Sequence, residues 1–294
     1  MLKNDLFNFV CKDFSLSEVS SIIYDSLFLE KKQNRNIYAV ISGAENIGAS
    51  WLSLTIAHTL NKQNNKVLVV DGVGNFSNIL EYLYLQNSLF IEDYISGKKT
   101  LNQLISAYKN KDFNILTGKS GNNYIATAPL GRTQVLASDL QIIADSYDYS
   151  FIDIGNELSP NNIALCNIAN EIIILCSENN TDMVKTFDII KSINESGLNV
   201  KYSLIVNKVN SYEDGYKVYE RLSSVMEKNG LNFPNLLGII RFDARIRDTI
   251  KNKELLLNRY PESEAALDIC EIVKKIEQGL WYGQGSKVWC FEFF

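Results

Sequence analysis

The chain is poor in the residue types that metal sites and disulfide frameworks need. Among its 294 residues there is one histidine, His58, and the five cysteines show no CxxC spacing. A zinc site needs several His or Cys ligands at short spacing, so the sequence predicts none. An odd number of scattered cysteines is typical of a protein from a reducing compartment. We therefore expect a cytoplasmic protein without a structural metal.

Long hydrophobic runs and a basic surplus are also missing. No stretch reaches the length of about eighteen apolar residues that predicts a membrane-spanning helix. The first residues mix charges with apolar side chains, unlike the apolar core of a signal peptide. The formal net charge is -5, which argues against the basic surface that non-specific nucleic-acid binding requires. We therefore expect no specific nucleic-acid partner.

Apolar residues, by contrast, are plentiful and regularly distributed. They make up 46% of the chain, enough for one sizeable core. Short apolar runs alternate with amphipathic stretches, which predicts a doubly wound α/β domain with a mostly parallel sheet of seven to eight strands and helices on both faces. The expected strands are 37–42, 66–71, 113–118, 149–154, 171–177, 202–209 and 235–240. The expected helices are 50–62, 76–86, 100–108, 133–146, 181–196, 214–229 and 262–279.

Two terminal segments lie outside this alternating pattern. In residues 1–34, Ser15 and Glu18 form a capping box that predicts a helix. We interpret this segment as a helical arm, either packed on the domain or available to a partner. The main domain is expected over residues 35–280. Residues 281–294 form an aromatic tail, for which packing on the body, a partner site and membrane contact stay open. The tail lacks the Lys/Arg face that supports membrane contact.

A glycine-containing loop follows the first expected strand and precedes a helix. Gly43 and Gly48 lie in this loop, which ends at Ser50. Glycines allow close backbone approach, and a helix N-terminus presents free N–H groups, so the geometry is that of a phosphate cradle. A working cradle also has a lysine near its end, where this chain has Ala49, and Glu45 adds a negative charge. Nucleotide binding and a turn kept for folding both stay open on this evidence.

Taken in order along the chain, these segments resemble the MinD/ParA superfamily of P-loop ATPases. The resemblance is greatest to its flagellar-number regulator branch, the FlhG (YlxH) proteins. The family loop has the pattern G-K-G-G-x-G-K-[ST]. Gly43, Gly48 and Ser50 match this pattern, while Ala44 and Ala49 replace its two lysines. The resemblance therefore implies a phosphate-binding loop that has become degenerate.

Further family positions follow at the ends of later strands, and the resemblance covers about residues 35–280. Asp71 matches a family aspartate, but Val73 replaces the aspartate that positions the attacking water. Asp153 corresponds to the Mg²⁺-water position, and Asn207 to the asparagine that contacts adenine. The resemblance thus implies a remnant nucleotide site made of Gly43, Gly48, Ser50, Asp71, Asp153 and Asn207. Ser50 and Asp153 would be metal ligands only when a Mg-nucleotide binds.

The missing groups determine the expected function. Hydrolysis depends on positive charge near the transferred phosphate, and the residues that supply it are absent. We therefore expect no catalytic residue, no cofactor, and a role as a regulator or scaffold in flagellar placement, number or assembly. The resemblance implies two kinds of partner, the flagellar signal-recognition-type GTPase and components of the flagellar base. It also implies a polar or membrane-peripheral location within the cytoplasm.

Two alternative functions stay open. In the first, the chain would be an active ATP-dependent switch with an unusual loop, and it would need ATP and Mg²⁺. In the second, it would be a MinD-like protein that localises pili or other polar structures. Dimerisation is likewise undecided. In the family the signature lysine reaches across an ATP-bound dimer, and Ala44 stands in its place.

Overall fold

The structure, a computed structural model, describes residues 36–73, 79–83, 89–108, 113–119 and 124–279. The chain divides between Asn34 and Arg35 into two units, and every described residue belongs to the second. The helical arm expected over 1–34 and the aromatic tail expected over 281–294 therefore lie outside the described residues.

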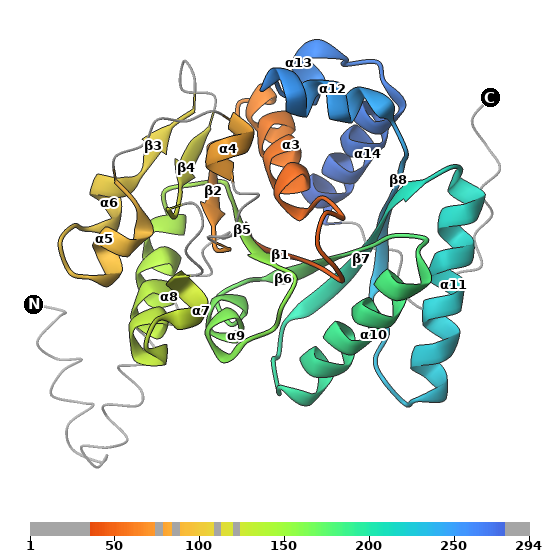
Figure 1. The fold of residues 1–294 in the computed structure, drawn as a ribbon, viewed down its shortest axis with the longest axis horizontal. Coiled ribbons are helices and arrows are strands. Elements are labelled where there is room, and N and C mark those ends of the chain that lie inside the picture. The colour runs from red at the N-terminus through yellow and green to blue at the C-terminus, as the bar shows by residue number, and fades with distance from the viewer. Residues whose placement is uncertain (1–35, 74–78, 84–88, 109–112, 120–123, 280–294) are drawn as a thin grey trace, which may run out of the picture. The chain divides into compact units, whose positions relative to one another are not determined.

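One eight-stranded sheet runs through the described body, in the order β3-β4-β2-β5-β1-β6-β7-β8 (Figure 1). Every neighbouring pair is parallel except β3 and β4. This confirms the expected doubly wound, mostly parallel sheet, and each of the seven expected strands is present. The strands are β1 (Asn36–Ser42), β2 (Val67–Asp71), β3 (Ser106–Ala107), β4 (Asn114–Leu116), β5 (Tyr149–Gly155), β6 (Glu171–Cys176), β7 (Lys201–Val209) and β8 (Asn235–Arg241).

Helices cover both faces of the sheet. On one face lie α3 (Ala49–Lys62) and α14 (Glu264–Gln278), together with the shorter α13 (Leu256–Arg259). On the other face lie α8 (Leu130–Ala144), α9 (Pro160–Cys166), α10 (Asn180–Glu195) and α11 (Tyr212–Lys228). The remaining described helices are α4 (Ile79–Leu83), α5 (Ile91–Ile95), α6 (Leu101–Leu104), α7 (Tyr124–Thr127) and α12 (Ala244–Asn252).

The helix expected over 100–108 is wrong in its second half. Helix α6 ends at Leu104, and the chain then forms the edge strand β3. The cause is antiparallel pairing, because Ser106 lies opposite Ile115 and Ala107 opposite Asn114. The neighbouring strand therefore overrides the local helical pattern of apolar residues.

Each face of the sheet has its own hydrophobic layer. Successive side chains of a strand point to opposite faces. Accordingly Ile37 and Ile41 of β1 join the layer under α8 to α11, whereas Tyr38 and Val40 join the layer under α3 and α14. Tyr38 stacks on Phe151 of β5, with ring centroids 5.3 Å apart. This two-layer core fixes the strand register, because a slip by one residue would exchange the two sets of side chains.

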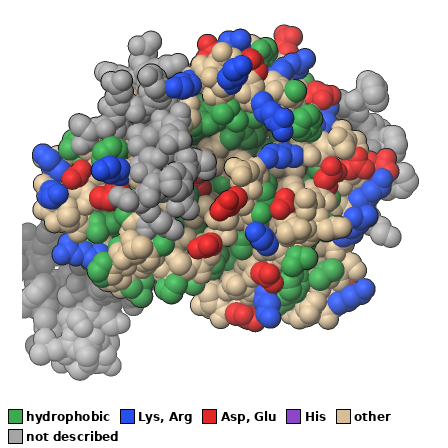
Figure 2. All heavy atoms as spheres, in the orientation of Figure 1, with side chains coloured by type: hydrophobic (Ala, Val, Ile, Leu, Met, Phe, Trp, Pro, Cys, Tyr) green, Lys and Arg blue, Asp and Glu red, His purple; other side chains and the backbone are tan. Residues whose placement is uncertain are grey.

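Charged side chains lie at the surface of the described body (Figure 2). The face shown in Figure 2 carries acidic and basic side chains interspersed with each other. Among the described helices, none has the length and apolar content needed to cross a bilayer. The carboxyl ends of β1, β2, β5 and β7 meet at one edge of the sheet, where ligands bind in doubly wound folds.

Candidate functional site

The loop between β1 and α3 is held close to its neighbours by two glycines. Gly48 caps α3 with a positive φ of 113°. A Cβ on Gly48 would lie 3.2 Å from the Asn207 amide nitrogen, and one on Gly43 would lie 2.2 Å from the hydroxyl of Thr186 on α10. Both glycines are therefore required by packing and backbone conformation alone, whether or not a phosphate binds.

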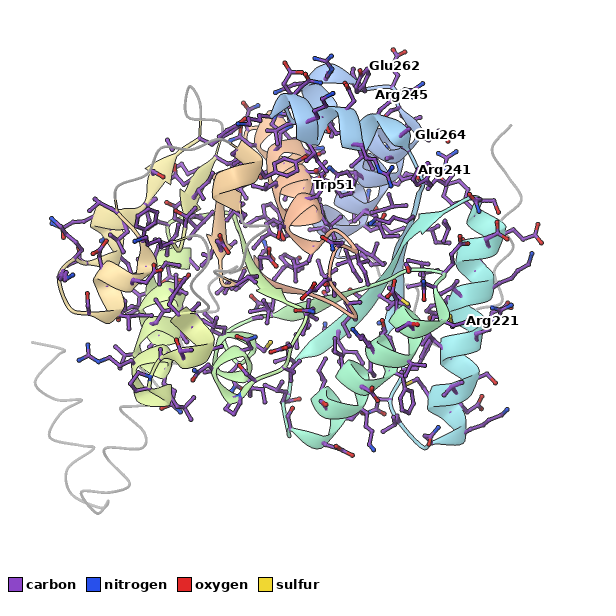
Figure 3. The ribbon with its side chains drawn as sticks, in the orientation of Figure 1. Trp51, Arg221, Arg241, Arg245, Glu262 and Glu264 are labelled. Atoms are coloured by element: carbon purple, nitrogen blue, oxygen red, sulfur yellow. The ribbon has the colours of Figure 1, made fainter. Side chains whose placement is uncertain are left out.

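The two positions at which the family has lysine are part of the apolar core. Ala44 is 6% exposed and Ala49 is 7% exposed. Both belong to the hydrophobic layer that also contains Ile47 and Trp51. Figure 3 shows Trp51 at the start of α3, beside this loop. No positive side chain is therefore provided at either of these two positions.

Two buried carboxylates end neighbouring strands beside the loop. Asp71 of β2 and Asp153 of β5 are register partners, and both are fully buried. The Ser50 hydroxyl donates a hydrogen bond to Asp153 Oδ2, and the Gly155 N–H donates to Asp153 Oδ1 at 3.1 Å. Burial raises the pKa of Asp153 to about 6, although both hydrogen bonds act in the opposite direction. The structure thus brings Ser50, Asp71 and Asp153 into one cluster.

Val73 lies just beyond the end of β2 and has no polar atom with which to orient water. Its side chain is next to Gly155, where a Cβ would lie 3.2 Å from the Val73 methyl groups. Nearby, the buried Tyr124 donates its hydroxyl to the Asp71 carbonyl at 2.9 Å. Sequence reasoning missed Tyr124, because only the fold brings α7 to the end of β2.

Two side chains of strand β7 form hydrogen bonds to the main chain of the loop between β1 and α3. Asn207 is 2% exposed, and its Nδ2 donates to the Ile47 carbonyl at 2.8 Å. The ammonium of Lys208 donates to the carbonyl of Asn46, and burial lowers the pKa of Lys208. Lys208 also has a positive φ of 62°, which is uncommon outside glycine and concentrates at functional or constrained sites. Its position directly after Asn207 was the signal that could have identified it.

All six expected remnant-site residues thus lie at the same edge of the sheet, but their fit to Mg-ATP is only partial. The Ser50 hydroxyl beside the Asp153 carboxylate has the oxygen chemistry that Mg²⁺ prefers. The phosphate side does not fit, since Ala44 and Ala49 provide no charge. Within the described ranges, no group of three His, Cys, Asp or Glu could hold a metal ion on its own. The expectation that these residues hold no cofactor therefore stays a prediction.

Comparison with known proteins gives two curated relatives along most of the chain. FleN of Pseudomonas aeruginosa, described as an antiactivator, is 19% identical over 250 residues, which cover 82% of this chain and 86% of FleN. The flagellum site-determining protein YlxH of Helicobacter pylori is 23% identical over 269 residues, which cover 90% of each chain. No protein-family profile matches the chain.

Among solved structures, the fold matches the septum site-determining protein MinD of Pyrococcus horikoshii, which was solved with Mg-ADP. The TM-score is 0.68 at 19% identity, with 83% of this chain and 96% of the MinD chain covered. This likeness shows the fold, while the relationship to a particular branch rests on FleN and YlxH. Strand order, the loop after β1 and these two relatives agree in supporting the expected resemblance to the MinD/ParA superfamily and its FlhG-like branch.

Proposed function

We propose that the chain is a flagellar-number regulator that acts by binding other proteins and has no ATP cycle of its own. The flagellar context is supported by YlxH, whose name assigns it to flagellum site determination. The observation that carries the proposal is the burial of Ala44 and Ala49 in the apolar layer at the two lysine positions of the family. On this proposal the remaining loop residues serve the fold.

Electrostatics supports the absence of an ATP cycle. One pair of unit charges about 4 Å apart contributes roughly 4 kcal/mol at the effective dielectric of a protein surface. Two missing lysines therefore remove several kcal/mol of attraction for phosphate, and the exposed Glu45 in the same loop adds repulsion. Asp153 supports the same conclusion, because burial raises its pKa and no positive side chain is among the groups that lower it.

One observation favours a second candidate, an ATP-dependent switch with an unusual loop. The hydrogen bond from Ser50 to Asp153 keeps a hydroxyl and a carboxylate together where a Mg-nucleotide would need them. In this candidate Asn207 would release the Ile47 carbonyl and contact the base. The two candidates differ in one respect, since only the switch depends on the Ser50–Asp153 pair.

The partners that we propose are the flagellar signal-recognition-type GTPase and components of the flagellar base. The place of action would be the cytoplasm at the cell pole or along the membrane periphery, reached through those partners.

A complementation experiment tests this function. In cells of the source organism that lack the protein, flagella are counted and located by electron microscopy after the wild-type chain, Ser50→Ala or Asp153→Asn is restored at equal abundance. We expect both variants to restore the wild-type number and position of flagella. On this proposal the protein binds no nucleotide, so neither side chain has a ligand to hold. Failure of both variants, with normal protein levels, would instead favour the ATP switch. A deletion that changes pili and leaves flagella normal would overturn the flagellar assignment.

A further inference from the structure

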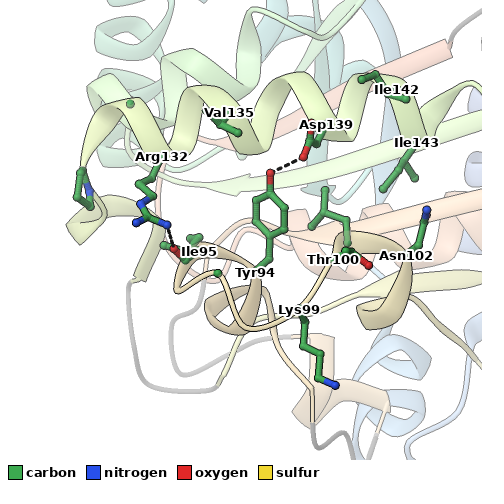
Figure 4. Close-up of a pocket in the computed structure, with 14 residues that line it drawn as sticks. Tyr94, Ile95, Lys99, Thr100, Asn102, Arg132, Val135, Asp139, Ile142 and Ile143 are labelled. Atoms are coloured by element: carbon green, nitrogen blue, oxygen red, sulfur yellow. Dashed lines mark hydrogen bonds between the residues drawn. The ribbon is translucent and has the colours of Figure 1, made fainter.

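A groove lies between α5, α6 and α8, apart from the loop that follows β1. Its volume is about 750 Å³, in the range of pockets that hold ligands or side chains of a partner. We call it the α5–α8 groove (Figure 4). Its apolar lining comes from Tyr94, Ile95, Leu101, Val135, Ile142 and Ile143. None of the six remnant-site residues contributes to it, so the groove is separate from the remnant site.

Helix α8 presents apolar side chains along this groove. Val135 is 57% exposed and Ile142 is 65% exposed. They are seven positions apart, so they lie on the same face of the helix. Asp139 lies between them. Its carboxylate accepts a hydrogen bond from the Tyr94 hydroxyl at 2.5 Å, and this bond connects α8 to α5 across the groove (Figure 4). Together with the other apolar residues that line the groove, Val135 and Ile142 form a continuous apolar lining that is open to solvent.

The rim of the groove is basic, although the whole chain is acidic. Lys99 and Arg132 line the groove, and Lys98 precedes Lys99 as an exposed neighbour. One guanidinium nitrogen of Arg132 donates to the Ile95 carbonyl at 2.6 Å, which holds the side chain at the rim. None of these three cations forms an ion pair with a described carboxylate. The rim therefore has a local positive charge although the chain has a formal net charge of -5.

We propose that the α5–α8 groove binds an acidic amphipathic helix of a partner protein. Grooves lined by helices accept an amphipathic helix through anchors at positions i, i+3 or i+4, and i+7. Val135 and Ile142 are two turns apart, about 10 Å along the axis, which matches that spacing. The apolar face of the partner helix contacts these two residues. Its Asp and Glu side chains lie toward Lys99 and Arg132.

The test selects peptides with no prior choice of sequence. A display library of random peptides of roughly four helical turns is selected on the full-length wild-type chain. Affinities of the enriched peptides are then measured by fluorescence anisotropy for the wild type, Ile142→Asp, Val135→Asp and Lys98→Glu/Lys99→Glu. Val184→Asp is the matched control, because Val184 is 62% exposed on α10, away from the groove. Thermal melting of each variant checks that it is folded.

We expect the enriched peptides to combine helically spaced apolar residues with Asp or Glu. Their Kd should rise roughly tenfold in each groove variant, as for central interface residues, and should not change in Val184→Asp. Added salt should weaken binding, because the rim contacts are electrostatic. Peptides without this pattern, no enrichment, or an equal loss in Val184→Asp would overturn the proposal.

Two other occupants are outcomes of the same set of variants. Vesicles containing phosphatidylglycerol would cosediment with the wild type and not with Ile142→Asp if the groove binds lipid. Light scattering would show a dimer that Ile142→Asp dissolves if the occupant is a second copy of the chain. Either result replaces the partner helix and overturns the proposal.

Discussion

Asn207 on β7 donates its side-chain amide to the main-chain carbonyl of Ile47 at 2.8 Å, although 160 positions separate them in the sequence. The donor is buried, and the acceptor lies in the loop between β1 and α3. The resemblance predicts an adenine contact for this asparagine, whereas in the structure its amide fixes the loop to the sheet. The following residue, Lys208, reinforces the same attachment through the carbonyl of Asn46.

Replacement of Asn207 by alanine should therefore lower the stability of the empty protein. A buried carbonyl that loses its donor costs about 1–3 kcal/mol, so the free energy of unfolding should fall by about that amount. Urea denaturation of Asn207→Ala beside Asn210→Ala, which changes an exposed asparagine of the same segment, checks this. Equal stability of the two variants would mean that the Asn207 amide is not holding the loop.

Asp153 is a carboxylate kept at a cost to stability. Burial raises its pKa from 3.8 to about 6, so its proton is bound more tightly in the folded than in the unfolded chain. The resulting stability is present below about pH 4 and is lost as the pH rises through 6. Asp153→Asn retains an acceptor for the Gly155 N–H and carries no charge. At pH 8 this variant should unfold at a higher temperature than the wild type, and at pH 4 the two should coincide. A lower melting temperature at pH 8 would show that the ionised carboxylate has a stabilising partner.

Glu171, at the start of β6, predicts a second pH dependence of the free energy of unfolding. It is 5% exposed on β6, and burial raises its pKa from 4.5 to about 7 against the opposing effects of Ser203 and Lys201. Protonated Glu171 therefore stabilises the folded state fully below pH 4.5, and this stabilisation is lost as the pH rises through 7. The loss in the free energy of unfolding amounts to about 3 kcal/mol. Glu171→Gln should be more stable than the wild type at pH 8.5 and equal to it at pH 4.5 in urea denaturation. The exposed Glu178→Gln is the control and should leave the pH profile unchanged.

Arg241 at the end of β8 connects two acids of α14 that differ strongly in burial; Figure 3 labels Arg241 and one of them, Glu264. Its guanidinium is 2.9 Å from Asp268 and 2.8 Å from Glu264, and the two acid side chains are 0% and 60% exposed. Asp268 also accepts hydrogen bonds from the Arg241 N–H at 2.8 Å and from the Tyr212 hydroxyl. Asp268→Ala should cost about 3 kcal/mol of unfolding free energy, because it leaves partly buried groups unpaired. Glu264→Ala should cost less than about 1 kcal/mol, as exposed ion pairs do. Similar losses for the two variants in chemical denaturation would contradict this difference in burial.

Sequence reasoning found the central strands and the position of the loop, and it failed where tertiary contacts decide the structure. Continuous apolar runs such as 171–177 identify strands that are buried on both faces, and β6 lies there. Short helices such as α7, with only four residues, are too brief to show a helical period. The residues of β3 have a helical pattern but follow the hydrogen-bonding edge of β4.

The candidate site likewise contains some residues that the sequence identifies and others that only the fold reveals. Ser50 and Asp153 were identified from the resemblance to the family, Ser50 at the end of the loop after β1 and Asp153 near the carboxyl end of β5, where doubly wound folds bind ligands. Tyr124 and Lys208 were missed because their contacts with the Asp71 and Asn46 carbonyls exist only after folding. The sequence did identify the missing lysines at positions 44 and 49. Only the structure shows that the alanines there are buried in the core.

Isothermal titration of the full-length chain with ATP and Mg²⁺, beside Asp153→Asn, tests the proposed loss of the ATP cycle most directly. We predict no measurable heat of binding for either protein, because the phosphates meet no positive charge at positions 44 and 49. A micromolar Kd for the wild type, about -8 kcal/mol, that disappears in Asp153→Asn would contradict this. The chain would then be an ATP-dependent switch in which another cation replaces the two lysines.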